Sequence, residues 1–253
     1  MGLNASGLIL YGSVNMPEAD GLTAGGAITG NIKVVFDNAD KTNVPSGQLG
    51  LNSSLAGDTS QVWFYGRNAG GNLINEMVTT NGITTVSGTL VYERLLKVAA
   101  TGTGFHNGTL TVRDFQNQTV VTLESGIHSV RRPFYGVSAE AAGGANKDYY
   151  EKVFLKNSDS TYALLGAQLH ETSDPSNKIV FALSNAQNDT ETVASRLNTA
   201  PTLVSAFSGL GKSVPGTDLN AGSGIGVWLK LTLNAGDVAA KTFYTIQASG
   251  SSI

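Results

Sequence analysis

Hydrophobic residues in this chain recur in short runs that suit β-strands better than helices. Aromatic, aliphatic and β-branched side chains dominate residues 62–67 and 73–78, and an Asn/Gly-rich stretch separates the two runs. Two such runs joined by such a turn predict a β-hairpin. Comparable runs, bounded by turn residues, occur at 32–36, 109–113, 119–124, 127–130, 151–157, 163–169, 178–183, 226–233 and 241–247. This pattern predicts an all-β protein with sandwich-like or barrel-like domains.

Helical periodicity is weak throughout the chain. The 31 glycines are spread along the sequence and interrupt windows long enough to show a 3.6-residue period. The best helix candidates, 91–99 and 191–197, are both short. The first fits a strand equally well, and its neighbours favour a strand.

A change in composition suggests how the chain is divided. Residues 139–147 are rich in Ala and Gly, which is typical of a flexible linker between domains. The first 30 residues are rich in Gly, Ala and Thr, which suggests an extended arm. We therefore predict an extended N-terminal arm (1–30), a first β domain (31–140), a linker (141–149) and an immunoglobulin-like β-sandwich domain (150–253).

The charge content favours contact with other protein subunits. Charged residues make up 14% of the chain, well below the usual quarter. A surface covered mainly by neutral polar groups suits extensive contact with neighbours. The net charge of −3 provides no basic surface for nucleic acid, and no apolar run approaches the roughly 18 residues of a membrane-spanning helix. We expect neither a nucleic-acid partner nor a membrane partner.

Residues for catalysis or metal binding are scarce. The chain has no cysteine, which excludes disulfides, thiolate zinc sites and cysteine nucleophiles. His106, His128 and His170 are far apart and show no metal-binding spacing. No Gly-x-Ser-x-Gly motif is present to place a serine nucleophile. We expect no enzyme activity, no catalytic or cofactor-binding residues and no metal.

The segment 206–213 fits a relaxed phosphate-loop pattern. Such a loop needs a strand before it and a helix after it. Pro215 and Gly216 follow almost at once and prevent that helix, so we interpret the segment as a Gly/Ser loop with a solvated Lys212.

Three further possibilities have weak support. Glu76 and Glu124 are a conceivable glycosidase pair, but a β protein of this size offers many such pairs. Trp63 and Trp228 are a conceivable sugar-stacking platform, although isolated tryptophans in strands are more often core or interface residues. Four side chains after the strand-like run 32–36 could supply oxygen ligands to calcium, but a polar turn explains them equally well. These are Asp37, Asn38, Asp40 and Asn43.

Several segments together resemble virion structural proteins of tailed bacteriophages. One is the stretch 58–82, with a strand, the turn Gly-Arg-Asn-Ala-Gly-Gly at 66–71 and an acidic hairpin partner. The others are Tyr92-Glu93-Arg94, 11–17, Gly25-Gly26-Ala27, 150–157 and 226–233. The resemblance covers most of the chain, rests on no signature motif and brings no catalytic residue.

The resemblance implies a non-enzymatic component of a phage particle. A capsid cement or decoration protein that stabilises adjacent capsid subunits fits best, with a neck, tail or fibre-associated subunit or a carbohydrate-binding β module as alternatives. The expected partners are the major capsid protein or another virion subunit, and further copies of this chain in a homo-oligomer. We expect folding in the host cytoplasm, consistent with the missing cysteine and secretory signal, and location in the virion. The expected interface residues are Tyr11, Met16, Trp63 and Trp228.

Overall fold

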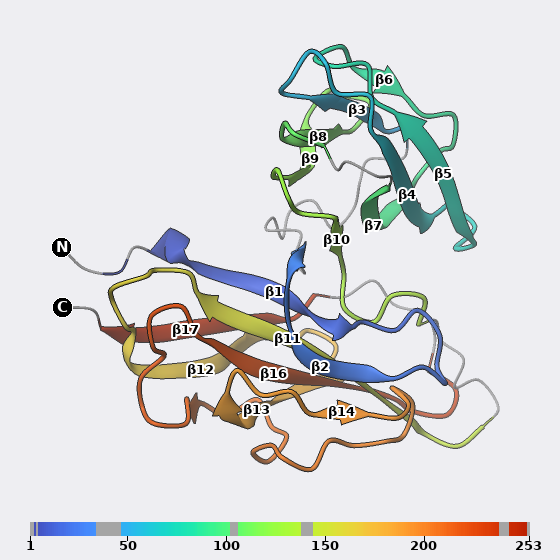
Figure 1. Cartoon of the computed structure of the whole chain (residues 1–253). Coiled ribbons are helices and arrows are strands. Elements are labelled where there is room, and N and C mark those ends of the chain that lie inside the picture. Colours follow the sequence, from blue (N-terminus) through green and yellow to red (C-terminus); the bar gives the residue numbers. More distant parts are fainter. Residues whose placement is uncertain are drawn as a thin grey trace. The chain divides into compact units, whose positions relative to one another are not determined.

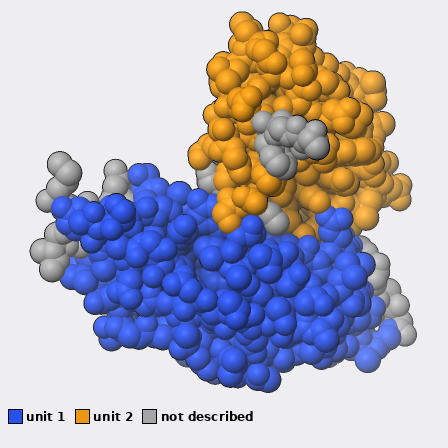
Figure 2. All heavy atoms as spheres, viewed as in Figure 1, with its two compact units in different colours: residues 1–29, 136–253 blue, residues 30–135 orange. Residues whose placement is uncertain are grey.

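The chain forms two compact units in a computed structural model that describes residues 3, 5–33, 47–101, 106–137, 144–237 and 243–251 (Figure 1). Unit 1 comprises residues 1–29 and 136–253, and unit 2 comprises residues 30–135 (Figure 2). In sequence, unit 2 is therefore inserted between two segments of unit 1. Within the described residues the helical content is a single 3₁₀ turn, η1 (Ala5–Gly7), so the predicted all-β class is confirmed.

Unit 1 contains two sheets. The larger has the strand order β13-β16-β11-β1-β2, with β14 also paired to β2, and the smaller has the order β15-β12-β17. The strands are β1 (Leu8–Asn15), β2 (Ala24–Lys33), β11 (Lys147–Asn157), β12 (Leu165–Ser173), β13 (Ile179–Gln187), β14 (Thr192–Val193), β15 (Lys212–Ser213), β16 (Gly224–Leu233) and β17 (Thr245–Ser251). The last residues of β2 belong to unit 2.

Unit 2 also contains two sheets. One has the order β10-β7-β4-β5, with β10 parallel to the end of β2, and the other has the order β6-β3-β8-β9. The strands are β3 (Gly50–Ser53), β4 (Gln61–Arg67), β5 (Leu73–Thr79), β6 (Val86–Ser87), β7 (Arg94–Thr101), β8 (Leu110–Arg113), β9 (Thr119–Leu123) and β10 (Ser129–Arg131). Buried apolar side chains from both sheets, such as Phe64 and Val112, form its core.

Local predictions in regions of strong patterning are confirmed. The hairpin expected at 62–67 and 73–78 is the β4–β5 pair, with Gln61 opposite Thr79 and Arg67 opposite Leu73. The ambiguous segment 91–99 contributes to strand β7. The second helix candidate, 191–197, is wrong: it contains the two-residue strand β14, which pairs with Gly25 and Ala24 of β2.

The predicted N-terminal arm is wrong, because this segment supplies strands to unit 1. β1 pairs antiparallel with β11, from Leu8 opposite Asn157 to Gly12 opposite Val153. The Gly-rich composition that suggested an arm instead permits tight packing. At Gly25, φ is 90° and an added Cβ would lie 2.6 Å from Cη2 of Trp228.

The predicted domain boundaries change accordingly. The limits of unit 2, 30–135, lie close to the predicted domain 31–140. Strand β11 begins at Lys147, so the last residues of the predicted linker 141–149 form a strand; residues 141–143 lie outside the described part. The segment 150–253 is not a complete domain, because its larger sheet takes β1 and β2 from the N-terminal segment.

Candidate functional site: the outer face of β4 and β5

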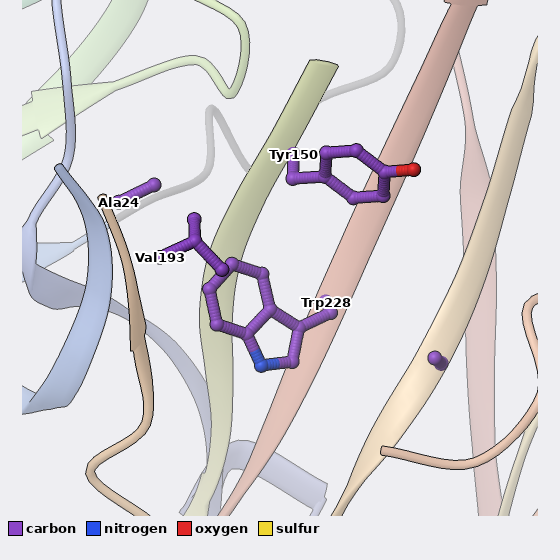
Figure 3. Packing of buried hydrophobic residues seen from close by; sticks show 5 residues of the cluster. Ala24, Tyr150, Val193 and Trp228 are labelled. Atoms are coloured by element: carbon purple, nitrogen blue, oxygen red, sulfur yellow. The ribbon is translucent and has the colours of Figure 1, made fainter. Parts of the chain in front are cut away.

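Trp228 belongs to the core and does not form an interface. Its side chain is fully buried and packs in a cluster with Ala24, Tyr150, Ala182 and Val193 (Figure 3). Both faces of β16 are covered, since β2, β14 and the segment carrying Phe207 lie over the Trp228 side. The prediction that Trp228 contacts another subunit is therefore wrong.

The other three predicted interface residues are divided between the two units. Tyr11 and Met16 are half-buried in unit 1, and the ammonium of Lys156 lies 5.6 Å from the centre of the Tyr11 ring. Trp63 is half-buried in unit 2. With Trp228 buried in unit 1, the two tryptophans belong to different units, so the sugar platform imagined from this pair has no basis.

Trp63 is part of a surface on the outer face of the β4–β5 hairpin. Its ring stacks on Tyr65, with a centroid separation of 6.0 Å. Met77 of β5 lies opposite Trp63 in the ladder, and Asn75 lies opposite Tyr65. Leu73 follows at the same face because side chains alternate along a strand. We call these five residues the β4–β5 face.

The β4–β5 face is apolar and open to solvent within the described residues. Leu73 is 50% exposed and Met77 is 45% exposed, while the alternate residue Val78 is buried in the unit 2 core. The ammonium of Lys97 lies 4.9 Å from the centre of the Tyr65 ring. This face therefore combines two aromatic rings, two exposed aliphatic side chains, one amide and one cation.

β5 also has a free edge. Among the described strands it pairs only with β4 (Figure 1). The amide of Thr80 donates to the carbonyl of Ser60 (2.9 Å), and that of Asn68 donates to Asn72 (3.1 Å). Backbone bonding alternates along an antiparallel strand. The even-numbered residues of β5 consequently bond β4, and the odd-numbered residues direct their backbone groups away from it.

A buried ion pair in unit 1 has a structural role. The ammonium of Lys152, whose side chain is fully buried, pairs with the carboxylate of Asp189. It also donates to the carbonyls of Gly26 (3.2 Å) and Glu191 (3.4 Å), and Ser184 donates to the same carboxylate (2.9 Å). Burial lowers the pKa of Lys152, and Asp189 opposes that shift. A lysine with no exposed surface cannot reach a substrate. Its contacts instead join β11 to β2 and to the loop after β13.

A second buried cluster fixes the N-terminal segment. The guanidinium of Arg196 bonds Glu151 (3.1 Å), which is fully buried, and Asp20 (3.0 Å). It also donates to the carbonyl of Pro17 (3.2 Å). These contacts hold the connection between β1 and β2 against β11, which agrees with the absence of a free arm here.

In unit 2, Asp58 joins its own loop, which follows β3, to the loop that precedes β8. Its carboxylate accepts from the hydroxyl of Ser53 and from the amides of Gly108 (2.9 Å) and Asn107 (3.3 Å). Burial opposes ionisation of Asp58, but these bonds and the nearby His106 outweigh it and hold its pKa below the usual value. Both ring nitrogens of buried His106 face carbonyl oxygens, at 2.6 and 2.9 Å, so both contacts are donations only in the protonated ring.

The phosphate-loop resemblance has no structural counterpart. The ammonium of Lys212 folds back to Ser208, 2.6 Å from its hydroxyl, and donates to the carbonyl of Leu210 (3.2 Å). It also lies 4.5 Å from the centre of the Phe181 ring. Lys212 starts a strand, β15, and not a helix. The lysine is half-buried and closes its own loop, so the expectation that it is simply solvated was wrong.

The remaining candidate sites are weaker still. The carboxylate of Glu76 accepts from the amides of Thr89 (2.7 Å) and Leu90 (3.2 Å), so it anchors a loop. The potential calcium ligands at 37–43 lie outside the described residues. Within the described ranges, no group of three or more His, Cys, Asp or Glu side chains is placed to hold a metal ion. In the same part of the chain, no helix is long and apolar enough to cross a membrane.

Comparisons with known proteins give no identification. No protein family and no curated protein matches the chain. Among solved structures, the VP2 subviral particle of infectious bursal disease virus matches with a TM-score of 0.17 and 12% identity, covering 100% of this chain and 68% of that one. An oxalate decarboxylase of Bacillus subtilis matches with a TM-score of 0.12 and 9% identity, covering 92% and 79%. Likenesses this weak carry no argument about fold or function.

Proposed function

We propose that this protein is a non-enzymatic structural component of a tailed-phage particle, acting as a cement or decoration protein on the major capsid protein or on another virion subunit. The observation that carries the proposal is the β4–β5 face. Exposed Leu73 and Met77 lie beside the aromatic pair Trp63 and Tyr65 on one sheet surface. Contiguous exposed apolar surface on a soluble domain marks a site of interaction, and aromatic residues and Met are enriched in the cores of protein interfaces.

The use of acidic side chains supports a structural role. Asp58, Glu76, Asp114, Asp174 and Glu191 each accept backbone amide hydrogens in loops, for example from Gln118 (2.8 Å) to Asp114 and from Thr202 (2.6 Å) to Glu191. Each such bond satisfies a loop donor that would otherwise depend on water. The carboxylates thus hold connections between strands in place, as a rigid building block requires.

Contacts at this face would be mainly apolar. Burial of Leu73 and Met77 contributes about 25 cal/mol for each Å² of apolar surface removed from water. Ionic screening weakens exposed ion pairs but hardly affects apolar burial. We therefore expect binding to a particle to persist at high salt. Residues 8–29 contain strand β1 and most of strand β2, so deletion up to Thr29 would remove strands of unit 1 and is no test of an arm.

The test is co-sedimentation of the purified protein with particles that lack it, at low salt and at 1 M salt. We expect wild-type protein to bind in both, and Trp63→Ala, which removes the larger ring of the face, to bind at least about tenfold more weakly, as an interface aromatic does. Leu210→Ser is the control, since Leu210 is 76% exposed but belongs to unit 1. Binding that disappears at 1 M salt, or equal binding by Trp63→Ala, would contradict the proposal.

A glycan-binding role for the same face is the second candidate. The pair Trp63 and Tyr65, with the amide of Asn75 opposite, offers ring surfaces and a hydrogen-bonding group. A glycan array separates the two. Binding to a defined sugar that Trp63→Ala abolishes, with no binding to particles, would favour the carbohydrate module over the virion subunit.

A further inference from the structure

Within the described residues, the free edge of β5 carries one device that protects such strands, the charge of Glu76, and lacks the others. Natural edge strands avoid pairing through proline, outward lysine, bulges or a covering segment. β5, with the sequence Leu-Ile-Asn-Glu-Met-Val-Thr, has no proline and no lysine, and its pairing with β4 is regular along the whole strand. Its one charge, Glu76, is engaged by the amides of Thr89 and Leu90. This edge is therefore ready to accept another strand.

The side chains at this edge are self-complementary in one antiparallel register. The odd-numbered residues direct their backbone groups outward, so they must face odd-numbered residues of the incoming strand. With Asn75 opposite Asn75 of a second copy, Leu73 lies opposite Met77 at both ends. Each exposed aliphatic side chain then gains an aliphatic neighbour.

Neighbouring registers are less favourable. If the partner strand slides by two residues, Asn75 lies opposite Met77 and Glu76 lies opposite Glu76. Like charges directly opposite each other destabilise a sheet. If it slides by two further residues in the same direction, Met77 lies opposite Met77 and Leu73 lies beyond the end of the partner strand. The register centred on Asn75 is the one that pairs both aliphatic residues and separates the carboxylates, since Glu76 then lies opposite Ile74.

We propose that two copies of this chain associate through their β5 strands, antiparallel and centred on Asn75, to form one continuous sheet across a two-fold axis. Pairing joins the β4–β5 faces of the two copies into a single surface. The contact is isologous, so each copy supplies the same edge. This inference does not depend on the phage role, because it rests only on the edge geometry and on the pattern of exposed residues.

A proline at the centre tests the backbone pairing. The amide of Asn75 points away from β4, and proline is tolerated at edge positions of that kind. Asn75→Pro should keep the circular dichroism of the wild type and the fluorescence of Trp63, yet weaken self-association by at least about tenfold, because two central hydrogen bonds are lost. Asn75→Ala, which retains the amide, is the matched control and should associate as the wild type does.

Self-association is measured by sedimentation velocity over protein concentrations from about 1 µM to about 1 mM, because a strand-pair contact is smaller than a standard interface and is expected to be weak. We expect a reversible monomer–dimer equilibrium. A chain that stays monomeric throughout this range, or a folded Asn75→Pro variant that associates like the wild type, would overturn the proposal.

Single cysteines test the register. The chain has no cysteine, so an introduced thiol can only link to its counterpart in another copy. Directly opposed residues of a hydrogen-bonded pair have Cα atoms about 5.5 Å apart, within the range of a disulfide. Asn75→Cys should therefore form a disulfide-linked dimer under mild oxidation. Met77→Cys should not, since its counterparts lie four residues apart along the strand, at roughly 3.4 Å per residue. Cross-linking of Met77→Cys but not Asn75→Cys would overturn the proposed register.

Discussion

The buried pair of Lys152 and Asp189 allows the energetic role of a charge to be measured directly. Replacing Asp189 by Asn removes the carboxylate charge from a lysine with no exposed surface. The ammonium keeps the carbonyls of Gly26 and Glu191 as acceptors. Breaking a buried ion pair from one side typically costs 3–5 kcal/mol. Because carbonyl groups remain around the ammonium, we expect Asp189→Asn to lower the free energy of unfolding by about 3 kcal/mol, at the lower end of that range.

The matched background is Lys152→Met, which keeps an unbranched side chain but removes the charge. In that background Asp189 has lost its cation and keeps the hydroxyl of Ser184 and the amide of Glu191 as donors. Asp189→Asn should then cost less than about 1 kcal/mol, since no buried charge is left unpaired. The difference between the two backgrounds is the coupling free energy of the pair.

Urea unfolding followed by fluorescence is the assay. Trp228 reports unit 1 when Trp63 has been replaced by Phe, because the chain has two tryptophans. With a urea dependence of about 2 kcal/mol per M, a loss of about 3 kcal/mol lowers the midpoint by about 1.5 M. Equal midpoint shifts for Asp189→Asn in both backgrounds would refute the reasoning, because the pair would then contribute no coupling.

Three further predictions concern single positions. Gly25→Ala should destabilise unit 1 by at least about 3 kcal/mol, because φ is 90° and the new methyl meets Trp228, whereas Gly21→Ala, with nothing within 4 Å, should be nearly neutral in the same urea assay. Since the pKa of Asp58 is lowered in the folded state, its stabilisation of unit 2 is present above the unfolded value of about 3.9 and is lost as the pH falls through the folded pKa. Unfolding followed by Trp63 fluorescence in a Trp228→Phe background should show this loss, and Asp58→Asn should flatten it. Lys212→Met should lower the free energy of unfolding by about 1 kcal/mol, because its bonds to the 208–210 loop are lost. A thermal shift of the wild-type protein on addition of ATP would contradict the structural interpretation of that loop.

Sequence patterning predicted those parts of the fold that depend on neighbours close in the chain. The β4–β5 hairpin was accessible because its two strands and Asn/Gly turn are contiguous. The place of β1 was not, since its partner β11 lies far along the sequence and the intervening composition gives no sign of the pairing. The glycines of β2 looked like flexible chain, whereas Gly25 is needed because the Trp228 ring and the backbone of Glu191 approach so closely.

The candidate surface was found only in part for the same reason. That Trp63 is an interface residue stays a prediction, and its partners Leu73 and Met77 could have been found from the alternation of the predicted hairpin. That β5 is an edge strand depends on the order of strands in the sheet, which local patterns do not encode. The burial of Trp228 depends likewise on β14, a two-residue strand with no periodic signal of its own.

The insertion of unit 2 into unit 1 sets an order of events during synthesis. β1 leaves the ribosome first, but its partner β11 follows about 150 residues later, on the order of 10 s at typical elongation rates. Unit 2 is one continuous stretch and is complete before β11 is made. Once it has folded, most of the chain between β2 and β11 is no longer a flexible loop, which reduces the entropy lost when the two ends of unit 1 meet. For those seconds the nascent strand Leu8–Asn15 lacks its partner β11, so one of its edges stays open while chaperone binding and aggregation compete with folding.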